Sequence, residues 1–282
     1  MPESLQVFKG KMLGRLAFFF LRDRRKVAIT NIRRVFAHLS DREITSIAKR
    51  NFEKLGINFI ELLLISYLSK REVIERFAIE GREFFEEALK KGKGVIVLAF
   101  HFANWEVAGI VSNFFDQDFI VLARPLKKHR LLNNFLNHVR ESAGLTIIVN
   151  ENVAQEVMRL LKKNKVVVIL GDQRGKQSRG VFVDFFGTKV PTPKGIAMIG
   201  MKTRSPVVPI YPVRKGFLRY TYVCGEPIEM ERAGNIEELV VKNTQKINAF
   251  LETIILKYPD EWFWVHRRWG RRNRNNDQNQ PR

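Results

Sequence analysis

Five short apolar segments in the middle of the chain constrain its fold more than any other feature. They cover residues 94–100, 118–124, 145–149, 165–171 and 205–213. These segments are too apolar to have a solvent-exposed face, and helical patterns at 130–143 and 153–164 lie between some of them. Apolar strands that alternate with helices are typical of a parallel sheet with helices on both faces. We therefore predict an α/β fold with a mostly parallel central sheet covered by helices.

The segments before and after this region have different patterns. The first eighty residues predict helices, and Ser40 with Glu43 three residues later forms a capping box that starts one of them. No strand is predicted before residue 90. Residues 217–225 predict an added antiparallel strand, and residues 235–257 predict a long helix.

These patterns predict three parts of the chain. Residues 1–85 form a helical N-terminal extension that lies near a membrane, and residues 86–270 form the α/β domain. Residues 271–282 are rich in Asn, Gln and Arg and predict a basic disordered tail.

The charge of the chain favours a polyanionic partner. The sequence has 49 Lys and Arg against 29 Asp and Glu, a formal net charge of +20. The first fifty residues hold 12 basic and 4 acidic side chains, and residues 265–282 hold 6 and 1. Such a field attracts nucleic acid, an anionic membrane surface or a phosphorylated substrate. Because the sequence has no recognisable nucleic-acid-binding module, we expect no nucleic-acid partner.

From the targeting and cysteine patterns we expect the protein to stay on the cytoplasmic side. Its N-terminus lacks a signal peptide, and its longest apolar stretches, 12–21 and 57–68, contain Arg15 and Glu61. A spanning helix needs about 20 apolar residues, so any membrane contact is expected to be peripheral. The lone Cys224 excludes an internal disulfide, and no Cys/His cluster has the spacing of a zinc site.

A histidine and a glutamate follow the first apolar strand, in the stretch VIVLAFHFANWEVAG. Ligands of open α/β sheets bind beyond the carboxyl ends of the strands. Within one helix, five residues would separate His101 and Glu106 by roughly 140°, so His101 must precede a helix that Asn104 caps. Glu106 then accepts a hydrogen bond from one ring nitrogen, and the other nitrogen is free to act as a general base.

The same His-x4-acid spacing occurs a second time, which leaves a structural interpretation open. His38 and Glu43 also fit the pattern. The capping box accounts for Glu43, and no strand ends near His38. The pattern by itself therefore makes His101 and Glu106 either a catalytic dyad or an ordinary structural pair.

Several linked motifs resemble one enzyme family over nearly the whole chain. They comprise HFANWE, Arg140 in NHVRESAG, GDQ at 171–173, and residues 24–44, 182–197 and 260–269. In order and spacing they resemble the late acyltransferases of lipid A biosynthesis, the lauroyl and myristoyl transferases. These belong to the wider lysophospholipid acyltransferase superfamily, which shares a His-x4-Asp/Glu motif. LGDQRGKQS replaces the FPEG-type motif of the glycerolipid branch, which favours the lipid A branch.

The resemblance implies a glycerolipid acyltransferase-like fold and an acyl-transfer reaction. A fatty acyl chain would pass from acyl carrier protein to a hydroxyl of a lipid A precursor or a related anionic glycolipid, without metal or bound cofactor. His101 would deprotonate this hydroxyl and Glu106 would orient His101. A lysophospholipid, an ornithine lipid or a glycosylated phosphatidylinositol are alternative acceptors.

The same resemblance implies a position at the cytoplasmic face of the bacterial inner membrane. Many members begin with a hydrophobic anchor, and this chain has only the short stretch at 12–21. Its basic N-terminal part favours an anionic membrane surface as a partner.

Further residues match the family or form basic groups near the predicted site. Arg140, Asp172 and Gln173 match motif positions, and Arg140 with Asp172 would hold substrate, brace the dyad, or form a purely structural buried pair. Phosphate-binding candidates are Arg124, Lys127, Lys128, Arg130 and Lys194. The first four lie in one strip without an acid, for which a solvated face is the alternative. Lys194 follows Pro193, a predicted first helical residue.

The segment WFWVHRR, residues 262–268, allows two interpretations. Its indoles and cationic side chains are typical of an interfacial segment. A core strand that turns Arg267 and Arg268 outward fits equally well.

Overall fold

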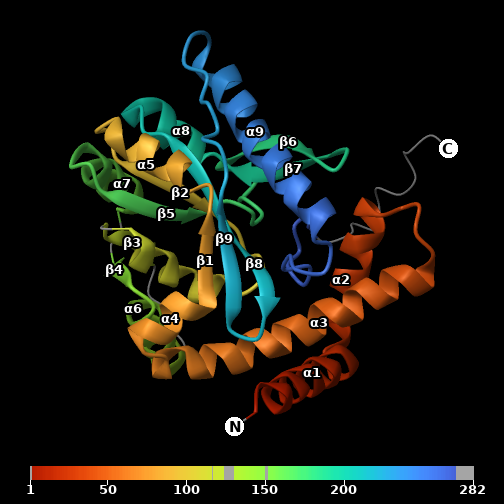
Figure 1. Cartoon of the computed structure of the whole chain (residues 1–282). Coiled ribbons are helices and arrows are strands. Elements are labelled where there is room, and N and C mark those ends of the chain that lie inside the picture. The colour runs from red at the N-terminus through yellow and green to blue at the C-terminus, as the bar shows by residue number, and fades with distance from the viewer. Residues whose placement is uncertain (1, 116, 124–129, 150–151, 271–282) are drawn as a thin grey trace, which may run out of the picture.

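A seven-stranded sheet organises the fold in the computed structural model, which describes residues 2–115, 117–123, 130–149 and 152–270 (Figure 1). The strands follow the order β1-β9-β8-β2-β5-β3-β4. Their bounds are Phe77–Glu80 (β1), Val95–Ala99 (β2), Phe119–Ala123 (β3), Leu145–Val149 (β4), Val166–Leu170 (β5), Val207–Gly216 (β8) and Arg219–Cys224 (β9).

Strand directions confirm the mostly parallel sheet. Strands β8, β2, β5, β3 and β4 pair parallel, and β9 runs antiparallel to β8 as predicted for residues 217–225. The expectation of no strand before residue 90 is wrong, because β1 pairs parallel with β9. With four residues, β1 is too short to display a strand period. The hairpin of β6 (Gly180–Phe185) and β7 (Thr188–Pro193) was not predicted either.

Helices occupy most of the remaining described chain. Their bounds are Glu3–Phe20 (α1), Arg22–Val35 (α2), Asp41–Leu64 (α3), Lys70–Arg76 (α4), Arg82–Lys90 (α5), Arg130–Ser142 (α6), Val153–Lys162 (α7), Gly195–Thr203 (α8) and Ile236–Lys257 (α9), with 3₁₀ segments at Ile65–Tyr67 (η1) and Trp105–Phe114 (η2). The capping box is confirmed: Ser40 Oγ accepts the Glu43 N–H, and Glu43 accepts the Ser40 N–H at 2.8 Å.

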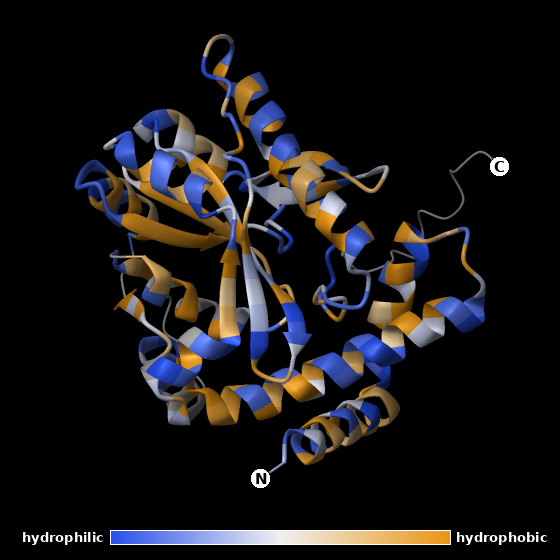
Figure 2. Cartoon of the chain, in the orientation of Figure 1, coloured by the Kyte–Doolittle hydropathy of each residue, from blue (hydrophilic) through white to orange (hydrophobic). Residues whose placement is uncertain are grey.

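Both faces of the central sheet are covered, as predicted. All five residues of β2 are buried. On one face, Phe85 of α5 stacks on Phe119 of β3 with ring centroids 5.4 Å apart. On the other face, α8 approaches closely at Gly200, where an added Cβ would lie 3.2 Å from Val207. Apolar residues accordingly dominate β2 and β5 in Figure 2, whereas β9 is paler and more polar.

Helix α1 packs against α3 through glycines. Gly10 and Gly14 are the buried residues of α1. A Cβ at Gly14 would collide with the Phe52 carbonyl, and one at Gly56 would collide with the Gly10 carbonyl. Large apolar side chains of α1, among them Phe8, Phe19 and Phe20, lie on its exposed surface. The described helices include none with the length and apolar content that a membrane span requires.

Asparagines of the N-terminal helices hold the backbone of the segment before residue 270. Asn31 Nδ2 donates to the carbonyls of Trp264 and His266, both at 2.8 Å. Asn51 Nδ2 donates to the Trp262 carbonyl at 2.7 Å. Because these bonds join both ends of the chain, the segment has a fixed backbone path.

Of the two interpretations of residues 262–268, the core strand with outward arginines is wrong. The segment consists of turns, and Trp262, Trp264 and Arg268 are fully buried. Arg268 donates to the Pro191 carbonyl at 3.1 Å and to Thr192 Oγ1 at 2.7 Å. Burial lowers the pKa of Arg268 to about 10, so the group remains protonated at neutral pH. The predicted division of the chain at residue 85 stays a prediction, and the predicted tail, 271–282, lies outside the described residues.

Candidate functional site

Strand register brings His101 and Asp172 together. Strands β2 and β5 are parallel neighbours in which Ala99 is the partner of Leu170. His101 and Asp172 each lie two residues beyond these strand ends, so they reach the same edge of the sheet. His101 Nδ1 lies 2.7 Å from Asp172 Oδ1, and the His101 backbone N–H donates to Oδ2 at 3.2 Å. The sequence shows that His101 and Asp172 each follow an apolar strand, but it does not show that these two strands, β2 and β5, are neighbours in the sheet.

Asp172 is a buried carboxylate with several hydrogen-bond donors. Its side chain is 2% exposed. Besides His101, the Trp262 indole donates to Oδ2 at 2.9 Å. Burial alone would raise the pKa of Asp172, but hydrogen bonds and charge from His101, together with the Trp262 bond, outweigh burial and lower it. Asp172 therefore stays ionised at neutral pH and favours a proton on Nδ1 of His101.

The second ring nitrogen of His101 faces the open side of the site. The Nε2 atom lies 3.1 Å from Nε2 of Gln173, which is exposed. The imidazole also contacts the rings of Trp105 and Phe263, with centroids 5.2 and 5.9 Å away. With its proton on Nδ1, the ring presents the Nε2 lone pair to the Gln173 amide.

The predicted hydrogen bond between Glu106 and His101 is wrong, because each side chain bonds to other partners. Its carboxylate accepts two bonds from Arg140, from Nε at 2.7 Å and from Nη2 at 3.0 Å. The Trp105 indole donates to the same carboxylate at 3.1 Å. Asp172 and Gln173 contact the two ring nitrogens of His101. Glu106 is paired instead with Arg140, whose planar guanidinium matches the two oxygens of a carboxylate.

Asn104 occupies the predicted cap position but does not cap. It precedes η2, and its side chain makes no cap hydrogen bond there. Instead, Asn104 Nδ2 donates to Glu61 Oε2 at 2.9 Å. The Asp172–Arg140 pair considered above is not formed either, because Arg140 pairs with Glu106.

The structure places only part of the predicted basic strip. Arg124, Lys127 and Lys128 lie outside the described residues, and Arg130 is the first residue of α6. Lys194 immediately precedes α8, which begins at Gly195. Pro193 ends β7 and is not the first helical residue.

Comparison with known proteins places the chain in one family. Residues 1–271 match the family model described as bacterial lipid A biosynthesis acyltransferase. The chain belongs to this family. The resemblance to lipid A acyltransferases found in the sequence is thereby confirmed. The protein is an acyltransferase of lipid A or a related glycolipid.

Individual relatives agree with this assignment. The lipid A biosynthesis palmitoleoyltransferase of Escherichia coli K12 is 25% identical over 273 residues, covering 96% of this chain and 87% of the relative. The lipid A biosynthesis lauroyltransferase of the same organism is 23% identical over 93% of this chain and 84% of its own. A phosphatidylinositol mannoside acyltransferase of Mycobacterium tuberculosis is 27% identical over 57% of this chain and 52% of the relative.

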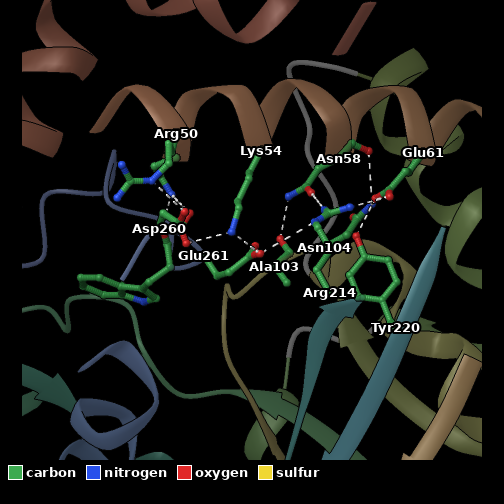
Figure 3. A network of polar contacts seen from close by, with 12 residues as sticks. Arg50, Lys54, Asn58, Glu61, Ala103, Asn104, Arg214, Tyr220, Asp260 and Glu261 are labelled. Atoms are coloured by element: carbon green, nitrogen blue, oxygen red, sulfur yellow. Dashed lines mark hydrogen bonds and ion pairs between the residues drawn. The ribbon is translucent and has the colours of Figure 1, made fainter. Parts of the chain in front are cut away.

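One face of helix α3 carries polar side chains that bond to the segments around the site of this acyltransferase (Figure 3). Arg50, Lys54, Asn58 and Glu61 project from that face toward the site loops. Their spacing of four, four and three residues matches the helical period. Sequence reasoning used Glu61 only to exclude a membrane span and missed this polar stripe.

Glu61 is fully buried and accepts four hydrogen bonds. Arg214 Nη1 at 2.6 Å and the Leu218 N–H at 2.8 Å donate to Oε1. Asn104 at 2.9 Å and the Tyr220 hydroxyl at 2.6 Å donate to Oε2. Burial and the Glu61 charge raise the pKa of Tyr220 well above its ordinary value, so Tyr220 remains a donor. This arrangement satisfies a buried carboxylate completely.

Asn58 links this network to the loop that carries His101. Asn58 Nδ2 donates to the Ala103 carbonyl at 2.6 Å, and the Ala103 N–H donates to the Glu261 carbonyl at 2.9 Å. Ala103 has φ of +46°, a conformation that side chains disfavour. Because both polar groups of its backbone are bonded, the loop keeps this conformation two residues after His101.

Neither a metal cluster nor a cysteine nucleophile is evident in the described part of the chain. There, no group of three or more His, Cys, Asp and Glu residues is arranged to hold a metal. Cys224 is buried at the end of β9, and burial raises the pKa of its thiol to about 12. Its thiol therefore stays protonated at neutral pH and does not act as a nucleophile.

Proposed function

We propose that this acyltransferase moves a fatty acyl chain from an acyl carrier protein thioester to a hydroxyl of a lipid A precursor or a related anionic glycolipid. His101 is the general base. The observation that supports this role is the His101–Asp172 pair, which holds Nδ1 on a carboxylate and leaves Nε2 toward the open side.

The reaction follows from this pair in two steps. The acceptor hydroxyl replaces the Gln173 amide at Nε2 of His101 and gives up its proton as its oxygen attacks the thioester carbonyl. Asp172 stabilises the imidazolium that forms. The tetrahedral intermediate then expels the thiolate, the C–S bond breaks, and the imidazolium returns the proton to sulfur. The acyl group thus passes directly from the thioester to the acceptor hydroxyl, and no covalent intermediate forms on an enzyme nucleophile.

Glu106 supports the site through Arg140 in this proposal. The carboxylate holds the guanidinium in a fixed orientation, with two donors occupied. Arg140 then positions a substrate oxygen beside His101. Arg124, Lys127, Lys128, Arg130 and Lys194 add positive charge for a phosphorylated acceptor.

A second acceptor class has support from one comparison. The chain is similar over 166 residues to a phosphatidylinositol mannoside acyltransferase. A glycosylated phosphatidylinositol therefore stands beside lipid A precursors as an acceptor with an anionic head group and free hydroxyls.

Product analysis tests the proposed function. The purified protein is incubated with acyl carrier protein thioesters and a panel containing a lipid A precursor, a lysophospholipid, an ornithine lipid and a glycosylated phosphatidylinositol. We expect mass spectrometry to detect the acyl mass increment on the lipid A precursor. Acylation of another panel member alone would reassign the acceptor, and transfer only from coenzyme A would reassign the donor.

We also propose that helix α1 attaches the protein to the cytoplasmic face of the inner membrane. Its exposed surface includes Leu5, Phe8, Met12, Leu13, Leu16, Phe19 and Phe20. Basic residues accompany them, so the helix combines apolar side chains with positive charge. Exposed apolar side chains insert into the membrane interface, and basic side chains are attracted to anionic lipids.

Vesicle binding tests this attachment. We expect co-sedimentation with anionic vesicles to weaken as salt rises, because salt screens the basic residues. Phe19→Ser with Phe20→Ser should weaken binding further by removing inserted rings. Ile236→Ser is the control, since Ile236 is 72% exposed at the start of α9. Salt-independent binding to neutral vesicles, or equal loss in the control, would refute the proposal.

A further inference from the structure

A cationic cavity adjoins the acyl-transfer site, and none of the predicted substrate-binding residues lines it. Its volume is about 570 Å³. It is lined by Arg174, Gly175, Lys176, Gln177, His266, Arg267 and Gly270. The lining comes from two segments, the one after Asp172 and the buried turn after Trp264.

The positive charge of the cavity lining has no negative partner in the described part of the chain. No carboxylate is among its lining residues. Arg174, Lys176 and Arg267 form no ion pair with any described Asp or Glu, although many surface cations of this protein do. Nε of Arg174 is buried and has no hydrogen-bond partner within that same part. A buried guanidinium donor without an acceptor has the desolvation cost that a bound anion would offset.

The cavity is joined to the catalytic pair by direct contacts. Gln173, which reaches Nε2 of His101, immediately precedes Arg174. The Arg174 backbone N–H donates to Nε2 of His266 at 3.1 Å. Three residues before His266, the Phe263 ring lies against the His101 imidazole. The segments that line the cavity are therefore the same two segments that contact the His101 ring through Gln173 and Phe263.

His266 lines the cavity, and burial favours its neutral form. Burial lowers its pKa and outweighs the opposing charge of Asp172. Because Nε2 accepts the Arg174 N–H, the neutral ring carries its proton on Nδ1. The lining thus offers cationic side chains without a carboxylate, and the chemistry that suits it is an anionic oxygen group.

We propose that this cavity binds a phosphate group of one of the two substrates while the reacting atoms lie at His101. The proposal rests on the proposed acyl transfer. Arginine forks bind phosphate oxygens in pairs, and lysine adds charge. Two sources share this chemistry: the phosphate on the glycolipid acceptor and the phosphodiester that links the pantetheine arm to its carrier protein.

Pyrophosphate binding tests the site without requiring turnover. Isothermal titration of the full-length protein is compared with a variant that carries Arg174→Gln, Lys176→Gln and Arg267→Gln. The control carries Lys162→Gln, Lys163→Gln and Lys202→Gln, which removes equal charge from exposed positions. We expect at least about tenfold weaker binding in the first variant and a change under about twofold in the control. Equal binding in all three proteins, or none in the wild type, would overturn the proposal.

Steady-state kinetics identify the source of the phosphate. We expect the cavity variant to raise KM for one substrate at least about fivefold, with kcat changed less than about twofold. An effect that disappears with a dephosphorylated acceptor assigns the acceptor phosphate, and one that disappears with an acyl-pantetheine donor assigns the carrier phosphodiester. Unchanged KM values for both substrates would refute a substrate-binding role.

The two proposals fail in different ways. A wild-type protein that binds pyrophosphate through Arg174, Lys176 and Arg267 but transfers no acyl group would refute the proposed function and leave the anion site. Thermal melts of all variants show whether the glutamine substitutions leave the fold intact, and the single variant Arg267→Gln provides a milder test.

Discussion

Replacing His101 with alanine is expected to lower kcat about 10²- to 10⁴-fold, as loss of a positioned general base does. Asp172→Asn should have an effect of similar size, because the amide no longer stabilises the imidazolium or fixes the proton on Nδ1. Acyl transfer by both variants is measured at saturating substrates. Their melting temperatures are recorded in parallel.

The chain provides its own control for this experiment. His38 has the same His-x4-Glu spacing, but Glu43 serves the capping box. His38→Ala should keep wild-type turnover, and Glu43→Gln should cost at most about 1 kcal/mol of stability. Wild-type turnover in His101→Ala, or activity losses in proportion to unfolding for both histidine variants, would contradict the catalytic role.

Glu106→Gln distinguishes the two carboxylates near His101. Because the amide no longer pairs with the Arg140 guanidinium as a charged partner, this variant should disturb substrate placement by Arg140 and raise KM. Asp172→Asn should act mainly on kcat. If Glu106→Gln instead reproduces the pure kcat loss of Asp172→Asn, Glu106 supports the histidine directly during catalysis.

Glu61→Gln is expected to lower the free energy of unfolding by about 3–5 kcal/mol, the range for breaking a buried ion pair. Glu61 is fully buried, and the variant leaves the Arg214 charge without its closest carboxylate. The amide also presents a donor where Arg214, Leu218, Asn104 and Tyr220 all donate. Denaturant unfolding measures the change, and Gln keeps the side-chain volume so that no cavity contributes.

Two further variants isolate the buried charge. Glu53 lies eight residues earlier in α3 and pairs with Arg15, which is 59% exposed. Glu53→Gln should change stability by less than about 1 kcal/mol. Adding Arg214→Met to Glu61→Gln should recover part of the loss, because both charges are then removed. A loss in Glu61→Gln no larger than in Glu53→Gln would contradict this account.

Local patterns were sufficient to predict most of the helices and strands. The apolar runs of β2 to β5 and the period of α9 depend on residues that are neighbours in sequence. Elements whose stability depends on distant partners were missed. Strand β1 has four residues and exists through its pairing with β9, and the β6–β7 hairpin lies against α9.

The sequence by itself determined which residues stand at the ends of the strands, and so it named His101 and Asp172 as members of the candidate site. Only the tertiary structure decided which of them bond to each other. Strand order places β5 beside β2, and parallel register then sets Asp172 opposite His101, while helix α6 brings Arg140 to Glu106. Spacing along the chain carries no information about strand order, because that order depends on how all the apolar faces pack together.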